Sequence, residues 1–103
     1  MENKKTLVIG ASNNPERYSN MAVQKLQKFN HEVLAIGQKD TQINDIKVGT
    51  VKEKFENLDT VTLYLNPQRQ EEYYDYIIQL NPKRVIFNPG TENPEFAKLL
   101  QQN

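Results

Sequence analysis

Nearly continuous apolar runs separated by a helical stretch limit this chain to a few folds. Residues 6–10 (TLVIG) and 32–37 (EVLAIG) are largely apolar without alternation, which is typical of strands buried on both faces of a parallel sheet. The segment between them predicts a helix over about residues 20–29, because its apolar residues recur at helical spacing: Ala22, Leu26 and Phe29. A right-handed crossover through this helix makes the two strands parallel neighbours. The first third of the chain is therefore expected to form a βαβ unit.

The rest of the chain continues this alternation. Apolar periodicity and the flanking turn residues predict five further elements: an edge strand near residues 47–50, a strand over 60–65, a helix from Pro67 to Leu80, a strand over 84–87 and a short helix from Pro94. Strands that alternate with helices indicate an α/β fold. We expect one doubly wound parallel sheet of about five strands in the order 3-2-1-4-5.

Composition limits the chain to one domain and to few partners. Of its 103 residues, 37% are hydrophobic, which is enough for one core, so we expect a single domain over residues 1–103. Thirteen basic and thirteen acidic residues give a formal net charge of +0, so we expect no nucleic acid and no membrane as partner. No apolar stretch is long enough to span a bilayer, and the start does not read as a signal peptide, so we expect a cytoplasmic protein.

Two residue types that often carry chemistry are scarce. The chain has no cysteine, and its one histidine is His31. Disulfides, thiolate metal sites and cysteine nucleophiles are therefore excluded, and a centre with several histidines cannot form within one chain. We expect no metal site, and the functional interpretation depends on polar and basic side chains.

The loops at the carboxyl ends of the strands are the candidate ligand site, because doubly wound sheets bind ligands there, where the strand order reverses. In the first loop, Gly10 permits close approach of the backbone, Ser12 and Ser19 offer hydroxyl donors, and Arg17 suits a two-pronged contact with phosphate. The amino end of the following helix favours an anion. This loop predicts a pyrophosphate site. The alternative is that Gly10 only turns the chain, Ser19 caps the helix and Arg17 is solvated.

The end of the second strand argues against NAD. A dinucleotide fingerprint needs three glycines in the first loop and an acidic residue after the second strand. This chain has only Gly10 in that loop, and Lys39 lies where NAD requires a carboxylate. A lysine there suits a phosphorylated ribose, either the 2′-phosphate of NADP or the 3′-phosphate of coenzyme A (CoA). An ordinary surface lysine is the alternative.

These loops carry a resemblance to a known family. The chain resembles the small bacterial CoA-binding proteins with a Rossmann-like fold, which are similar to the N-terminal domain of the succinyl-CoA synthetase α subunit. The resemblance covers nearly the whole chain and is carried by these segments: residues 8–12 (VIGAS), 17–19 (RYS), 30–33 (NHEV), 36–39 (IGQK), 65–67 (LNP) and 87–93 (FNPGTEN).

The resemblance implies a division of the ligand among the loops. In that family the first loop binds the coenzyme's phosphates and the end of the second strand holds its phosphorylated ribose. The loops after the fourth and fifth strands frame the nucleotide and pantetheine. Carried over to this sequence, the implied cofactor-binding residues are Gly10, Ala11, Ser12, Asn13, Arg17, Tyr18, Ser19, Asn20, Gly37, Lys39, Asn66, Pro67, Asn88, Pro89, Gly90, Thr91 and Glu92.

No catalytic residue is expected. The related synthetase works through a phosphorylated histidine in a separate domain, for which this sequence has no counterpart, and His31 falls between the first helix and the second strand. That connection lies at the edge of the sheet opposite the ligand, where we expect a solvated histidine. Of the possible acid–base groups, Glu92 is expected to cap the last helix or bind a ligand amide. Tyr18 is expected to pack on an adenine or a neighbouring helix.

The sequence is compatible with three functions. The leading one is a small protein that binds CoA or an acyl-CoA without catalysis. The alternative is an enzyme, either an NADP-binding oxidoreductase-like protein or a CoA-ligase component that acts with a partner chain. An oxidoreductase normally needs a further region to hold its substrate, and the sequence offers none. The third is an interaction protein whose nucleotide pocket is vestigial.

The tyrosine-rich helix suggests a subunit contact. Tyr73, Tyr74 and Tyr76 extend around more than one face of the predicted helix, and tyrosine is enriched at protein interfaces. Stacking on single-stranded nucleic acid is disfavoured because acidic residues flank the three tyrosines. We expect a homodimer through this helix. The alternative is a monomer in which Tyr76 lies over neighbouring side chains.

Overall fold

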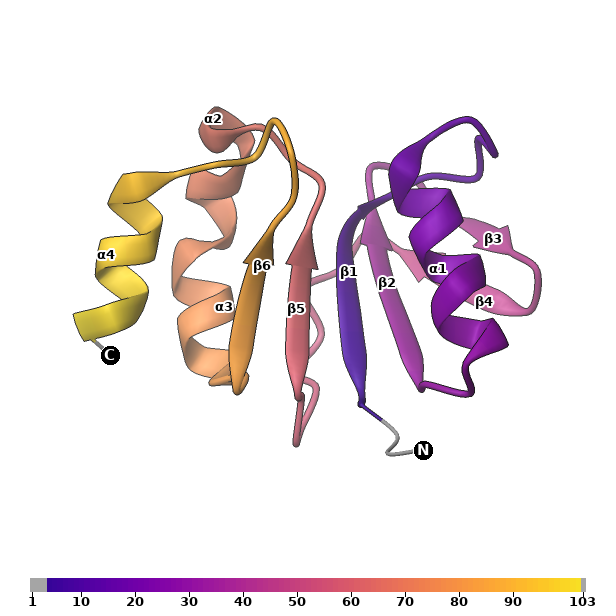
Figure 1. The fold of residues 1–103 in the computed structure, drawn as a ribbon, viewed down its shortest axis with the longest axis horizontal. Helices are drawn as coiled ribbons and strands as arrows, with labels where there is room; N and C mark the ends of the chain where they lie inside the picture. Colours follow the sequence, from indigo (N-terminus) through magenta and orange to yellow (C-terminus); the bar gives the residue numbers. More distant parts are fainter. Residues whose placement is uncertain (1–3, 103) are drawn as a thin grey trace.

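Six strands form one sheet in the computed structural model, which describes residues 4–102 (Figure 1). The sheet order is β3-β4-β2-β1-β5-β6. The five predicted strands are parallel and stand in the predicted order, β4-β2-β1-β5-β6, with β1 between β2 and β5. The strands are β1 (Thr6–Ala11), β2 (Val33–Gly37), β3 (Thr41–Ile43), β4 (Ile46–Gly49), β5 (Thr60–Leu63) and β6 (Arg84–Phe87).

The first strand is buried on both faces, as its unbroken apolar run predicts. Leu7 and Ile9 belong to the core on the side of α3 (Tyr74–Leu80) and α4 (Pro94–Gln102). Val8 belongs to a second core beneath α1 (Tyr18–Lys28), together with Val23 of that helix. Adjacent residues of a strand point to opposite faces. The sheet therefore separates two hydrophobic cores.

The strand predicted near residues 47–50 is β4, but it is not the edge of the sheet. It pairs parallel to β2, as predicted, and antiparallel to β3, a strand that was not predicted. A two-residue turn joins β3 and β4, and Asn44 in this turn adopts a left-handed conformation with φ of 53°. Asparagine tolerates that conformation, so an Asn-Asp pair between two isoleucines was a detectable hairpin signal. The sheet is accordingly mixed, with an antiparallel edge strand.

The helix predicted from Pro67 to Leu80 is broken into three pieces. It consists of α2 (Pro67–Gln70), the 3-10 turn η1 (Glu71–Tyr73) and α3. The break coincides with a contact from outside the helix: Lys52 Nζ donates to the carbonyl oxygen of Glu72 and lies 4.9 Å from the centroid of the Tyr73 ring. An outside donor competes for a helix carbonyl, which favours the tighter turn. Periodicity along one segment cannot reveal such a contact.

The tyrosines that follow the break have partners within the chain. The Tyr74 ring stacks on Phe96 of α4 at 4.3 Å between centroids, and its hydroxyl accepts a hydrogen bond from Asn93. Tyr76 donates to the carbonyl oxygen of Glu53, and burial raises the pKa of Tyr76 to about 12. Tyr74 and Tyr76 thus connect α3 to two other segments of the same chain.

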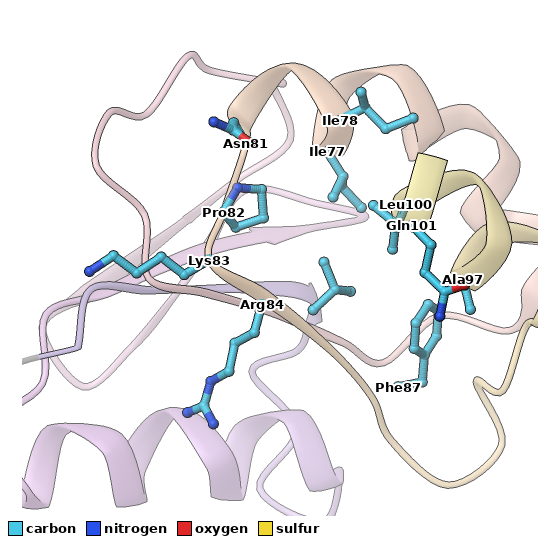
Figure 2. Close-up of a pocket in the computed structure, with 11 residues that line it drawn as sticks. Ile77, Ile78, Asn81, Pro82, Lys83, Arg84, Phe87, Ala97, Leu100 and Gln101 are labelled. Atoms are coloured by element: carbon cyan, nitrogen blue, oxygen red, sulfur yellow. The ribbon is translucent and has the colours of Figure 1, made fainter. Parts of the chain in front are cut away.

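The helices cover the sheet unevenly. In Figure 1, α1 crosses in front of β2 and its neighbours, whereas α3 and α4 lie on the other side near β5 and β6. Within residues 4–102, no helix covers the α1-facing side of β6. A separate hollow between the carboxyl end of α3 and α4 is lined by Ile78 and Leu100 (Figure 2). In that view Arg84 points away from this hollow and toward α1.

Candidate functional site

A hollow of about 300 Å³ lies at the carboxyl edge of the parallel strands. Loops that follow β1, β2, β5 and β6 form it, which is the place that the strand order predicts for a ligand. Its lining residues are Gly10, Ala11, Ser12, Arg17, Tyr18, Ser19, Gln38, Lys39, Tyr64, Leu65, Arg69, Pro89 and Thr91.

Two glycines allow the backbones to approach closely beside this hollow. Gly10 has a φ of +95°, and a Cβ on it would lie 3.0 Å from the carbonyl carbon of Tyr64. A Cβ on Gly37 would lie only 2.4 Å from the carbonyl oxygen of Ala11. Real Cβ atoms do not approach backbone atoms so closely, and positive φ favours glycine. The first loop therefore depends on glycine at both positions.

The amino end of α1 lacks a side-chain cap. The helix begins at Tyr18, two residues before the predicted start, and Arg17 occupies the capping position without making a capping hydrogen bond. The alternative role of Ser19 as a cap is therefore wrong: Ser19 lies inside the first turn and is buried. No acidic residue lies in the first turn. An uncapped helix start without a carboxylate suits an external anion.

Hydrogen bonds hold the first loop in shape. The buried side chain of Asn20 donates to the carbonyl oxygen of Ser12 at 2.9 Å, and the Ser12 hydroxyl accepts from the backbone N–H of Asn14 at 3.1 Å. Arg17 N–H donates to the carbonyl oxygen of Asn14 at 3.0 Å. Asn20 thus acts on the loop's shape, and the Ser12 hydroxyl hydrogen stays available as a donor.

The charge of the hollow is positive. Arg17, Lys39 and Arg69 line it, and none of its lining residues is Asp or Glu. Sequence analysis missed Arg69, which lies in the short helix α2. With its amide oxygen toward α2, Gln38 accepts hydrogen bonds from the Arg69 guanidinium. This contact joins the end of β2 to α2, next to Lys39. The sequence did carry a signal for Arg69: it is a basic residue in the first turn of a helix that begins at this edge of the sheet.

A buried glutamine joins the loops that follow β5 and β6. The Gln70 side chain is fully buried, and its Nε2 donates to the carbonyl oxygens of Leu65 and Thr91, each at 2.8 Å. Its Oε1 accepts from Asn93 at 3.0 Å. These three hydrogen bonds use both the Nε2 and the Oε1 of the buried amide, so neither atom depends on water for a partner. Gln70 is not among the residues that the sequence singles out.

The loop after β6 is organised by its own polar residues. Asn88 Nδ2 donates to Thr62 Oγ1 at 2.7 Å and to the carbonyl oxygen of Leu63 at 2.9 Å. Glu92 accepts from the backbone N–H of Gly90 at 2.9 Å. The expectation that Glu92 caps the last helix is wrong, because Asn93 Oδ1 accepts from Phe96 N–H at 3.1 Å and is the cap. The carboxylate of Glu92 is instead used within the loop.

The structure places nine of the seventeen predicted cofactor-binding residues on the lining of the hollow. The predicted residues that line the hollow are Gly10, Ala11, Ser12, Arg17, Tyr18, Ser19, Lys39, Pro89 and Thr91. Those that support the loops around it or lie beside it are Asn13, Asn20, Gly37, Asn66, Pro67, Asn88, Gly90 and Glu92. Asn66, for example, caps α2 by accepting from Arg69 N–H at 2.9 Å. Tyr18 is 79% exposed and is free to cover a ligand.

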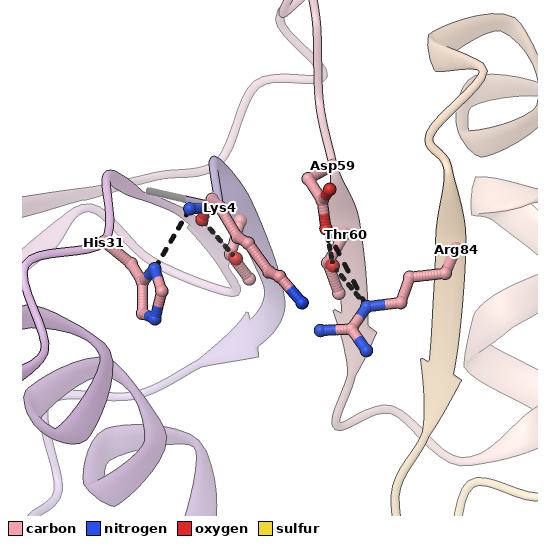
Figure 3. A network of polar contacts seen from close by, with 6 residues as sticks. Lys4, His31, Asp59, Thr60 and Arg84 are labelled. Atoms are coloured by element: carbon pink, nitrogen blue, oxygen red, sulfur yellow. Dashed lines mark hydrogen bonds and ion pairs between the residues drawn. The ribbon is translucent and has the colours of Figure 1, made fainter. Parts of the chain in front are cut away.

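His31 lies at the opposite edge of the sheet, as predicted, in the polar network of Figure 3. It is not simply solvated: the ring is partly buried, and its Nδ1 accepts from Lys4 N–H at 3.0 Å. In the same network Arg84 Nε donates to Thr60 Oγ1 at 2.7 Å and lies 3.8 Å from the Asp59 carboxylate. The hydrogen bond from Thr60 lowers the pKa of Asp59 below its ordinary value. These contacts hold the amino ends of the strands together.

Two further kinds of site are not found in the described part of the chain. Residues 4–102 contain no group of three or more metal-ligating side chains. No helix among them is long and apolar enough to cross a bilayer.

Comparison with known proteins defines the class of protein. A CoA binding domain model matches residues 4–103, and the chain therefore belongs to this family. An uncharacterized protein of known structure shares 42% identity with a TM-score of 0.96, over 99% of this chain and 84% of the other. A hypothetical protein from Pyrococcus horikoshii OT3 shares 26% identity with a TM-score of 0.83, over 98% and 72% of the two chains. A conserved hypothetical protein from Pyrococcus furiosus shares 25%, with a TM-score of 0.84, over 96% and 86%. The search among curated proteins gave no match.

Proposed function

We propose that the protein binds CoA or an acyl-CoA at the carboxyl edge of its sheet and does not itself catalyse a reaction. The observation that carries this proposal is the charge of the hollow, which presents three cations and no carboxylate beside an uncapped helix start. CoA carries a pyrophosphate and a ribose 3′-phosphate, so it requires positive charge at two separate places. The side chains present fit such a ligand.

The cations fall into two groups. Arg17 lies at the amino end of α1, where helix N–H groups favour an anion, and we assign it to the pyrophosphate. Lys39 follows β2, and Arg69 is joined to that segment through Gln38. We assign this second pair to the ribose phosphate. Gly10 and Gly37 admit a close backbone approach beside both groups.

The lining of the hollow supports binding without catalysis. General acid–base work is done most often by histidine or a carboxylate, and less often by lysine or tyrosine, within reach of the reacting atoms. None of the residues lining this hollow is Asp, Glu or His, and His31 lies at the other edge of the sheet. A reaction at the bound coenzyme that uses histidine or a carboxylate of the lining would need these groups from another chain. A CoA-ligase component that acts with a partner is therefore the second candidate.

Thermal denaturation with CoA, acetyl-CoA, NAD and NADP side by side tests the proposal. A ligand at about 100 times its Kd stabilises the native state by about 2.7 kcal/mol, so we expect CoA to raise Tm by about 10 °C or more. NAD has no phosphate for Lys39 and Arg69 and should give no comparable rise. A rise with NADP and none with CoA would contradict the proposal and favour the oxidoreductase-like alternative.

The second cationic group predicts a preference for CoA over dephospho-CoA. We expect the 3′-phosphate to strengthen binding by about 1.5 to 3 kcal/mol, the range of hydrogen bonds to charged groups. Lys39→Ala should remove much of this difference, and calorimetry with both ligands measures it. Lys28→Ala is the control, because Lys28 is exposed on α1 and does not line the hollow. Equal affinity of the wild-type protein for the two ligands would show that Lys39 has no such role.

Arg17→Ala is expected to weaken CoA binding with little effect on folding. The lost charged hydrogen bonds correspond to about 1.5 to 3 kcal/mol. The Arg17 side chain is exposed and makes no hydrogen bond or ion pair recorded among residues 4–102, so the Tm of the ligand-free variant should stay within a few degrees of wild type. Calorimetry and a melting curve on the same sample check both statements. Unchanged CoA affinity would contradict the assignment.

The oligomeric state stays a prediction. We propose a homodimer that leaves the carboxyl edge of the sheet open. The internal partners of Tyr74 and Tyr76 favour the monomeric alternative. Light scattering at micromolar concentration distinguishes the two, since a dimer has twice the chain mass of 12.0 kDa. A mass of one chain that does not change with dilution or added CoA would contradict the dimer.

A further inference from the structure

A groove of about 290 Å³ runs along the α1-facing side of β5 and β6, the part of the sheet that no helix of the described residues covers. One wall is formed by Ala22 and Leu26 of α1 and by Phe29, which directly follows this helix. Ile86 of β6 forms part of the other wall. The register of the sheet places Ile86 beside Thr62, and Thr62 beside the core residue Val8. The groove is therefore a lateral continuation of the core beneath α1.

The polar groups on the floor of the groove are already paired. Thr62 Oγ1 accepts from Asn88, and Thr60 Oγ1 donates to Asp59 at 2.7 Å and accepts from Arg84. Thr6 Oγ1 donates to the carbonyl oxygen of Lys4 at 2.9 Å. Among residues 4–102 no buried side-chain polar atom lacks a partner. A ligand on this threonine floor would contact methyl groups and needs no hydrogen bonds there. Lys25, His31 and Arg84 also line the groove.

The walls expose apolar surface to water. Phe29 is 42% exposed and Ile86 is 36% exposed, although both are large hydrophobic residues. Each lies on the groove, one on either side of it. Burying such side chains is favourable in proportion to the area removed from water. An apolar occupant would therefore be stabilised by both walls.

The groove meets the candidate coenzyme site at Tyr64. This residue lines both hollows, and α1 also lines both, with Ser19 in the coenzyme site and Ala22 in the groove one turn later. Asn88 lines the groove, and the next residue, Pro89, lines the coenzyme site. A chain that leaves the coenzyme site at the ends of β5 and β6 therefore enters the groove directly.

We propose that this groove binds the acyl chain of an acyl-CoA. The inference rests on the proposed function, and it adds that the bound form carries an aliphatic acyl group rather than a free thiol. With the nucleotide held after β1 and β2 by Arg17 and Lys39, the other arm of the coenzyme extends toward β5 and β6, where the groove begins. Two observations favour an acyl chain as the occupant. The groove adjoins the candidate coenzyme site at Tyr64, and the buried polar groups of its floor already have hydrogen-bond partners.

The test is the dependence of affinity on chain length. Calorimetry with CoA, acetyl-CoA, butanoyl-CoA and octanoyl-CoA below its micelle-forming concentration should show affinity rising along the series. We expect a gain of at least about tenfold from acetyl to octanoyl, since each fully buried methylene corresponds to roughly fourfold. Ala22→Trp should fill the groove and abolish this gain while leaving the affinity for CoA itself unchanged. Ile86→Asp, which puts a carboxylate in the opposite wall, should also reduce the gain.

Lys28→Trp is the matched control, because it adds the same ring to α1 at a position that does not line the groove. It should keep the full dependence on chain length. If CoA binds but its acyl derivatives bind no better, the groove proposal is overturned and the proposed function stands. The same holds if Ala22→Trp and Ile86→Asp, both folded by circular dichroism, keep the full gain. If neither CoA nor any acyl-CoA binds, the proposed function is overturned together with this inference.

Discussion

Gly37→Ala is expected to destabilise the protein by about 3 kcal/mol or more and to lower its Tm by more than about 10 °C. The new Cβ would lie 2.4 Å from the carbonyl oxygen of Ala11 and 3.0 Å from a methyl carbon of Val48. The closest of these atoms is backbone in the central strand and cannot turn aside. Either β1 and β2 separate at this point or the first loop shifts. Urea denaturation followed by circular dichroism measures the loss.

Gly49→Ala is the matched control for this substitution. Gly49 pairs with Ile36 on the neighbouring strand, and a Cβ built on it meets nothing within 4 Å. We expect its stability to stay within about 1 kcal/mol of wild type, since alanine replaces glycine in a strand without a clash. Equal stability losses in the two variants would show that close backbone contact at Gly37 is not the cause.

Gln70→Met is expected to have the other large effect. Methionine has a similar volume, but it would remove the donor to the buried carbonyl oxygens of Leu65 and Thr91 and one of the acceptors of the Asn93 amide. We expect a stability loss of about 3 to 5 kcal/mol, because each unsatisfied buried group costs about 1 to 3 kcal/mol. Leu65 and Thr91 line the candidate coenzyme site, so we expect CoA affinity to fall as well.

Gln79→Met controls for the change of residue type, because Gln79 is exposed on α3. Its stability should stay within about 0.5 kcal/mol of wild type. Denaturant curves and CoA titrations on both variants separate loss of the buried network from a general effect of methionine. A Gln70→Met protein as stable as wild type would contradict the role of this network.

The local pattern of apolar residues determined the order of the central strands and their burial. The apolar run of β1 required burial on both faces, and the two cores on either side of Leu7 and Val8 confirm it. The helical connection between β1 and β2 required a parallel pair, because crossovers are right-handed. Once the strand order followed, the carboxyl edge was fixed as the place for a ligand. Arg17 and Lys39 could be assigned to that edge from their positions after β1 and β2.

The tertiary structure decided which residues meet at that edge. Arg69 contacts Gln38 from a helix that lies far along the chain, and Gln70 joins loops after β5 and β6. Long-range contacts of this kind leave no periodic signal, because each depends on the orientation of two separate elements. The same reason applies to η1, where Lys52 interrupts a helix that the periodicity predicts as continuous.

The sequence by itself determined the α/β sheet, the order of its central strands and the edge that carries the candidate site, since apolar periodicity and crossover handedness act locally. Only the tertiary structure decided that β3 closes one edge, that Tyr74 stacks on Phe96 and that the α1-facing side of β6 stays uncovered. These features depend on how much of the sheet each helix can cover. The area of sheet that a helix covers is decided when the elements pack together, so no single segment of the sequence encodes it.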